Sequence, residues 1–145
     1  MGTDRTDTHF KVLVVDDSES TRLLIARIIT QELPVAATLA ASGAEAEREL
    51  KRTRFDVILL DLLMPDASGF DVLEWLRGNT TPNQSTPVLV VSALQDDETI
   101  KRCRQLGASV HIVKPILRET LVAAVREHLY SARGQDGQGE KPPGG

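Results

Sequence analysis

Five short apolar runs constrain the fold of this chain more than any other feature of its sequence. The runs occupy residues 10–15, 35–40, 56–60, 87–91 and 110–113. They are mostly continuous rather than alternating with polar residues, which is typical of parallel strands covered on both faces. Because an amphipathic segment follows each run, the sequence predicts strands that alternate with helices.

The helices are predicted from an apolar stripe or from cap residues. The first has an inward stripe of Leu24, Ile25, Ile28 and Ile29 and ends before Pro34. Cap signals predict three more, in chain order Ser42 with Glu45, Ser68 with Gly78, and Asp96 or Asp97 with Gly107. A fifth is predicted from the apolar stripe of Leu121, Val125 and Leu129, without an obvious cap at its start. Five strands and five helices with long crossovers favour an α/β fold, a single doubly wound (βα)5 domain. Its parallel sheet has the flavodoxin-like strand order 2-1-3-4-5.

The predicted domain covers residues 10–131. The polar stretch 1–9 and the Gly/Pro-rich stretch 132–145 are expected to be disordered tails, because neither has apolar side chains to bury. The chain is therefore either a stand-alone domain or a fragment that ends in a linker.

Composition excludes several classes of function. The net charge is −4 and Lys and Arg form no cluster, so direct binding of nucleic acid is not expected. No apolar run approaches the roughly 20 residues of a membrane span. The polar N-terminal stretch lacks a signal-peptide core, which predicts a cytoplasmic protein. The single cysteine, Cys103, excludes an internal disulfide and is interpreted as a small core residue.

Polar residues follow four of the five predicted strands. Asp16 and Asp17 follow the first, Asp61 the third, Ser92 the fourth and Lys114 the fifth. In the proposed strand order these four strands are neighbours, and sites in such sheets form at the carboxyl ends of the strands. We therefore expect three carboxylates, a hydroxyl and an ammonium group on one rim.

This combination suits phosphoryl transfer. Three nearby carboxylates repel one another unless a cation intervenes, and an all-oxygen site with open positions suits Mg²⁺. Lys114 adds a positive charge for a phosphoryl oxygen, and Ser92 adds a donor. Asp61 can then be the nucleophile that forms an aspartyl phosphate. Taken singly, each residue could instead be a helix cap, a turn former or a solvated side chain, but that interpretation must explain all of them at once.

The motifs resemble the receiver domain of two-component response regulators. They are "DD" at 16–17, "DLLMPDASG" at 61–69, "SA" at 92–93 and "KP" at 114–115, and the similarity covers about residues 10–130. The resemblance implies a phosphorylation-activated domain rather than an enzyme. Its phosphate would come from a histidine kinase or a histidine phosphotransfer protein, and its downstream target would be another protein.

The resemblance also implies a role for each residue. Asp17, Asp61 and the backbone carbonyl of Leu63 would bind Mg²⁺, with help from Asp16, usually through water. Lys114 would contact the phosphoryl group, and Ser92 would move to hydrogen-bond it. A cis peptide between residues 114 and 115 is frequent in the family. The conformational change would reach the surface of the fourth helix, fifth strand and fifth helix.

Three further positions bear on how the domain would switch and how long it would stay phosphorylated. His111 occupies the switch position, where the family usually has Tyr or Phe, and a partly exposed strand histidine is favoured over a pH-sensing role. By the same resemblance, Leu63 and Leu94 occupy the positions that would tune the lifetime of the phosphorylated state. Neither side chain can position a water by hydrogen bonding, which predicts slow hydrolysis.

A second class of function is a Mg²⁺-dependent phosphatase or phosphotransferase that also forms an aspartyl phosphate. Those enzymes have a D-x-D pattern whose second Asp is the acid/base, and here that position is Leu63. A third class, a flavin or nucleotide binder on the same fold, lacks support because no Gly-rich phosphate loop follows the first strand.

Overall fold

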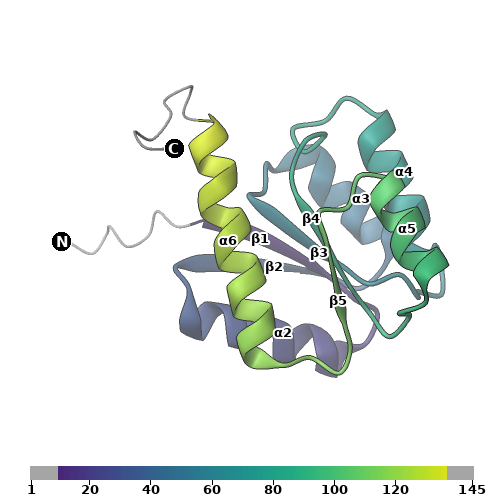
Figure 1. The fold of residues 1–145 in the computed structure, drawn as a ribbon. Helices are drawn as coiled ribbons and strands as arrows, with labels where there is room; N and C mark the ends of the chain where they lie inside the picture. The colour runs from purple at the N-terminus through teal and green to yellow at the C-terminus, as the bar shows by residue number, and fades with distance from the viewer. Residues whose placement is uncertain (1–9, 137–145) are drawn as a thin grey trace.

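The described part of the protein, residues 10–136 of a computed structural model, contains a five-stranded parallel sheet between two layers of helices (Figure 1). The strands are β1 (Phe10–Val15), β2 (Val35–Ala40), β3 (Val57–Leu60), β4 (Val88–Ser92) and β5 (Val110–Val113). Their order is β2-β1-β3-β4-β5, and every pairing is parallel. The predicted fold class and strand order are confirmed, with shifts of one residue at the edges of β3 and β4.

Five helices connect and follow the strands, namely α2 (Glu19–Glu32), α3 (Gly43–Arg52), α4 (Gly69–Gly78), α5 (Asp97–Gln105) and α6 (Arg118–Asp136). Figure 1 shows α2 and α6 on one side of the sheet and the other three helices on the opposite side. Both faces of the sheet are therefore covered, which explains why the strands are apolar at nearly every position.

Each helical layer encloses its own apolar cluster. Ile25, Ile28 and Ile29 of α2 pack with alternate residues of the central strands on one face. On the other face the intervening strand residues pack with α3, α4 and Cys103 of α5. Cys103 is buried, as expected, and burial raises the pKa of its thiol. Successive side chains along a strand thus pack alternately into the apolar cluster on one face of the sheet and the cluster on the other.

The predicted caps locate the helix starts correctly. Ser42 accepts a hydrogen bond from the amide of Glu45, and Ser68 forms a reciprocal capping box with Asp71. At α5 the open choice is settled by Asp96, whose carboxylate accepts from the amide of Thr99. Local sequence is sufficient at these positions because a cap needs only a short polar side chain beside the first turn.

The inward stripe predicted for α2 is wrong at Leu24, which is 47% exposed. The residues that face the sheet are Ile25, Ile28 and Ile29, spaced by three and four. The three buried isoleucines span about 100° of the helix, centred near Ile25, and Leu24 lies outside this arc, about 140° from Ile29. The helix contains six apolar residues, so the sequence does not by itself show which three are buried.

The last helix extends past the predicted end of the domain. The predicted domain ends at residue 131, and α6 continues to Asp136. Residues 1–9 and 137–145, where the rest of the predicted tails lies, are outside the described residues. Within residues 10–136, no helix combines the length and apolar character needed to cross a bilayer.

A buried asparagine joins three segments on the α3 and α4 side of the sheet. Asn83 has no exposed surface, and its amide nitrogen donates to the carbonyls of Leu50 at 2.8 Å and Thr53 at 2.6 Å. Its amide oxygen accepts from the backbone of Phe55 at 2.7 Å and the hydroxyl of Thr86 at 3.1 Å. All four hydrogen-bonding positions of this side chain are used.

We expect Asn83→Ala to lower the free energy of unfolding by about 3 kcal/mol, because it leaves several buried backbone groups without partners. Asn79→Ala is the matched control, since Asn79 is exposed and makes one hydrogen bond, to the carbonyl of Trp75. Its cost should stay below about 1 kcal/mol. Urea unfolding followed by circular dichroism measures both, and equal losses in the two variants would contradict the prediction.

Candidate functional site

Three carboxylates meet at the carboxyl ends of β1 and β3. Asp16 and Asp17 follow β1, Asp61 follows β3, and one oxygen from each lies within 4.8 Å of the others. Asp16 is 1% exposed and Asp61 4% exposed, whereas Asp17 is exposed to solvent. The register of the two strands explains the meeting, because Val15 pairs with Leu60, so their next residues end side by side.

Lys114 brings a positive charge to this cluster from the end of β5. Its Nζ lies 2.9 Å from Oδ2 of Asp16 and 3.4 Å from Oδ2 of Asp61. Burial alone would lower the pKa of Lys114, but its hydrogen bond to Asp16 and the two negative charges outweigh burial and raise it. The ammonium group therefore stays charged at neutral pH. The peptide bond from Lys114 to Pro115 is cis, as the resemblance implied.

The acidic cluster has more negative charge than Lys114 balances. The pKa of Asp61 is raised above its ordinary value, first by burial and then by the charge of Asp16, although Lys114 opposes both. Two buried carboxylates and an exposed third thus face one ammonium group. A donor set made only of oxygens, with a deficit of positive charge and one open side at Asp17, fits a hard divalent cation.

Asp16 also has the local role that a carboxylate before a helix often has. Its Oδ1 accepts from the amide of Ser18 at 2.9 Å, and its backbone carbonyl accepts from Arg22 at 2.9 Å. Ser18 in turn caps α2 by accepting from the amide of Thr21. Asp16 therefore stabilises the turn before α2 through Oδ1 and belongs to the acidic cluster through Oδ2, so both interpretations of this residue are correct.

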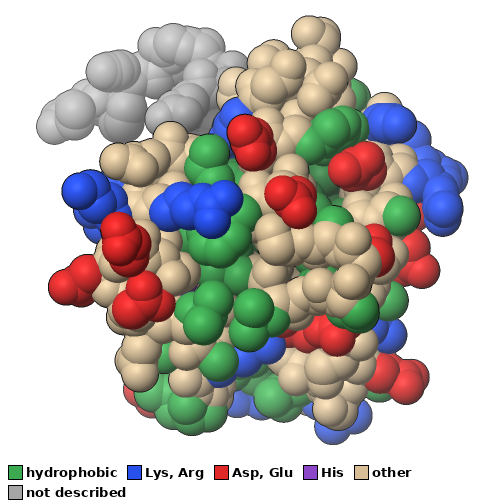
Figure 2. Space-filling view, turned by 90° about the vertical axis from the view of Figure 1, so that its right-hand side faces the viewer, with side chains coloured by type: hydrophobic (Ala, Val, Ile, Leu, Met, Phe, Trp, Pro, Cys, Tyr) green, Lys and Arg blue, Asp and Glu red, His purple; other side chains and the backbone are tan. Residues whose placement is uncertain are grey.

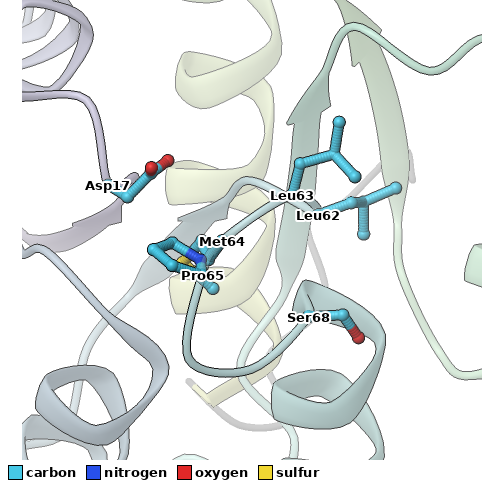
Figure 3. Close-up of a pocket in the computed structure, with 6 residues that line it drawn as sticks. All are labelled: Asp17, Leu62, Leu63, Met64, Pro65 and Ser68. Atoms are coloured by element: carbon cyan, nitrogen blue, oxygen red, sulfur yellow. The ribbon is translucent and has the colours of Figure 1, made fainter.

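The loop after β3 closes tightly beside Asp61. The amide of Leu63 donates to Oδ1 of Asp61 at 3.4 Å, and the amide of Gly69 donates to the carbonyl of Leu62 at 2.8 Å. A pocket of about 390 Å³ lies between this loop and Asp17. Figure 3 shows Asp17 across from Met64 and Pro65, with Ser68 at the start of α4.

Ser92 lies apart from the carboxylates in its hydrogen bonding. It is fully buried, and its hydroxyl accepts from the amide of Leu94 at 3.2 Å. The carbonyl of Leu94 lies 2.7 Å from Nε2 of His111, which must donate because a carbonyl cannot. Nδ1 of His111 is buried without a hydrogen-bond partner among the described residues. Leu94 is therefore held at both its amide and its carbonyl.

The two predicted lifetime positions have different surroundings. Leu63 is 54% exposed beside the pocket, while Leu94 is half-buried against the core cluster of α3, α4 and α5. One further residue of the loop, Asp66, was not predicted to contribute. Its carboxylate accepts from two amides in the first turn of α3. The only sequence signal for it is its position directly after "MP".

We expect Gly69→Ala to destabilise the protein by about 2 kcal/mol or more. A Cβ at this position would collide with the carbonyl oxygen of Asp61 and lie 2.7 Å from the Cα of Leu62. Gly78→Ala, at the end of the same helix, is the control, because nothing lies within 4 Å of its Cβ. It should stabilise by about 0.5 kcal/mol. Thermal unfolding separates the two, and a harmless Gly69→Ala would show that this loop is not closely packed.

Known proteins share both the sequence and the fold. RpfC, a sensory/regulatory protein of Xanthomonas campestris, is 32% identical over 125 residues, which are 85% of this chain and 17% of RpfC. RegX3, a sensory transduction protein of Mycolicibacterium smegmatis, is 35% identical over 88% of this chain and 54% of its own length. The chain thus spans about half or less of these curated relatives.

A solved structure and a family model agree with these relatives. The chemotaxis response regulator CheY4 of Vibrio cholerae superposes with a TM-score of 0.77 at 32% identity, covering 84% of this chain and all of CheY4. The model of the response regulator receiver domain matches residues 12–126, which include the acidic cluster, four whole strands and all of β1 except its first two residues. The chain therefore belongs to the CheY-like receiver domains of two-component response regulators.

Proposed function

We propose that this receiver domain accepts a phosphoryl group on Asp61 in a Mg²⁺-dependent step and signals through a conformational change. The observation that carries the proposal is the meeting of three carboxylates with Lys114 at one end of the sheet. Family membership implies a two-component kinase as partner. The donor would be that histidine kinase or a histidine phosphotransfer protein.

The chemistry needs one bond to form and one to break. A carboxylate oxygen of Asp61 attacks the phosphorus of the donor, and the bond from phosphorus to the donor's imidazole nitrogen breaks. The nitrogen keeps the electron pair, and the product is an acyl phosphate on Asp61. Lys114, 3.4 Å from Asp61, is placed to balance charge on the incoming phosphoryl oxygens.

The residues that would hold Mg²⁺ are Asp17, Asp61 and the backbone carbonyl of Leu63, with Asp16 acting through water. When bound, the ion supplies positive charge for the phosphoryl oxygens. The exposed carboxylate of Asp17 and the adjacent pocket leave room for the ion and for a donor to approach. The two carboxylate oxygens of Asp16 already accept hydrogen bonds, one from Lys114 and one from the amide of Ser18. This suits binding of the ion through water rather than directly.

The switch would involve the contacts around Leu94. The hydroxyl of Ser92 accepts from the amide of Leu94, and its own hydrogen can donate to a phosphoryl group on Asp61. Movement of Ser92 toward that group would pull on the loop that His111 also holds, so His111 would pass the change to β5. The affected surface would be that of α5, β5 and α6. A pH-sensing role for His111 stays the less favoured alternative.

An enzyme that turns over the aspartyl phosphate is the alternative, and Leu63 argues against it. Its exposed side chain stands beside the pocket and cannot transfer a proton. We therefore propose a phosphoacceptor rather than a phosphatase or phosphotransferase enzyme.

The downstream target is proposed to be a protein, with no direct binding of nucleic acid. On the face drawn in Figure 2, hydrophobic side chains lie between separate acidic and basic groups, and no continuous basic surface is visible there. A cytoplasmic location remains a prediction from the polar N-terminal sequence. The activity of any larger protein that contains this domain would depend on the output region that accompanies it.

We expect the parent protein to gain one phosphate per chain from phosphoramidate in the presence of Mg²⁺, and none when the metal is chelated. Asp61→Asn should gain none, because an amide cannot form the acyl phosphate. Asp97→Asn, an exposed position in the first turn of α5, is the control and should label fully. Intact-mass analysis measures all three, and full labelling of Asp61→Asn would overturn the proposal.

We expect the phosphorylated protein to decay slowly, because neither Leu63 nor Leu94 can hold the attacking water. Leu63→Asn or Leu94→Glu should speed decay by about tenfold by positioning that water. Leu23→Asn is the control, since Leu23 is similarly exposed but lies on α2. The phosphorylated mass is followed after the donor is removed. Fast decay in the parent, unchanged by either substitution, would contradict this account.

A further inference from the structure

One carboxylate ties the loop between β3 and α4 to the start of α3. Oδ1 of Asp66 accepts from the amide of Gly43, and Oδ2 accepts from the amide of Ala44, each at 3.1 Å. The first amides of a helix have no partner within it, so both are available to an outside acceptor. The amide of Glu45 is bound separately, by the hydroxyl of Ser42 at 3.2 Å.

The tether depends on close approach of the loop to the helix. A Cβ on Gly43 would lie 3.0 Å from the Cβ of Ala67 and 3.5 Å from Oδ2 of Asp66. A larger residue at position 43 would therefore push the loop away. The amide of Gly43 is also the main reason that the pKa of Asp66 lies below its ordinary value, so this carboxylate is ionised at neutral pH.

The tethered loop is the one that forms a wall of the candidate site. Its base is closed by the hydrogen bond from Gly69 to Leu62, and its middle is held at Asp66. Residues 63–65, between these two restraints, line the pocket together with Asp17. The amide of Leu63 is in addition bound to Asp61. A restraint at Asp66 is thus transmitted to the backbone beside both carboxylates.

We propose that Asp66 is a positioning residue of the phosphoacceptor site, which holds the backbone of Leu63 in place beside Asp17 and Asp61 before any cation binds. This deepens the proposed function and rests on it. Asp66 does not contact the reacting atoms. Its effect comes from fixing the loop, so that the loop does not have to be ordered when the cation binds.

The test compares Asp66→Ala with Ser42→Ala in the full chain. Both variants remove hydrogen bonds from the same helix start, but only the first releases the loop. In metal-free protein, Asp66→Ala should speed amide exchange over residues 63–68 by about fivefold or more, with no such change in Ser42→Ala. Titration with Mg²⁺ alone, followed by NMR shifts, should show affinity weakened by about tenfold only in Asp66→Ala.

Equal behaviour of the two variants in both measurements would overturn the proposal, because Asp66 would then be only a helix cap. If Asp66→Ala fails to fold, Asp66→Asn gives the same comparison, since it keeps one acceptor oxygen and should show an intermediate effect. A parent protein that binds Mg²⁺ but gains no phosphate would instead refute the proposed function. The exchange and affinity comparisons would still decide the role of Asp66 in that case.

Discussion

A shared ammonium group links the ends of three strands in this protein. Lys114 follows β5, yet it pairs with Asp16 after β1 and Asp61 after β3, both nearly buried. Removing one partner of such a buried arrangement leaves an uncompensated charge, which is costly. The pairing therefore restrains the relative positions of strand ends that are 53 and 98 residues from Lys114 along the chain. The cluster remains short of positive charge, and that deficit makes it suited to bind a cation.

The loop after β3 shows how the backbone supports this chemistry. Gly69 allows the chain to return against the carbonyl of Asp61, and Gly43 allows the loop to approach α3. Asp66 then joins the two elements. The loop is thus held at two places, at Gly69 against Asp61 and Leu62, and at Asp66 against Gly43. Under the proposed function, such restraint would matter beside Asp61, because phosphoryl transfer depends mainly on positioning and charge.

Much of the fold follows from the sequence because it depends on local patterns. Continuous apolar runs separated by capped helices favour parallel strands, and that topology places strand ends on one rim. Asp16, Asp17, Asp61 and Lys114 could therefore be predicted to meet before any distance was known. Leu24 was misplaced because adjacent apolar residues hide which stripe is buried. The end of α6 was missed because the Gly-containing sequence near residue 134 is typical of a linker.

The features that could not be predicted are contacts between residues far apart in the chain. Asn83 binds backbone groups about 30 residues away, and nothing in the local sequence distinguishes it from a loop asparagine. Asp66 likewise binds amides 22 and 23 residues away. The sequence marks the start of α3 at Ser42, but it does not show that Asp66 contacts this start. Such contacts depend on how the layers pack, whereas caps and stripes do not.

The central claim is that the paired carboxylate of Asp61, and no other, becomes the acyl phosphate. Borohydride reduction of the phosphorylated protein converts an acyl phosphate to an alcohol, and peptide mass spectrometry then locates the converted residue. The account predicts homoserine at position 61 alone, formed only when Mg²⁺ was present during phosphorylation. Conversion at Asp16 or Asp17, or conversion at position 61 that does not depend on the metal, would contradict it.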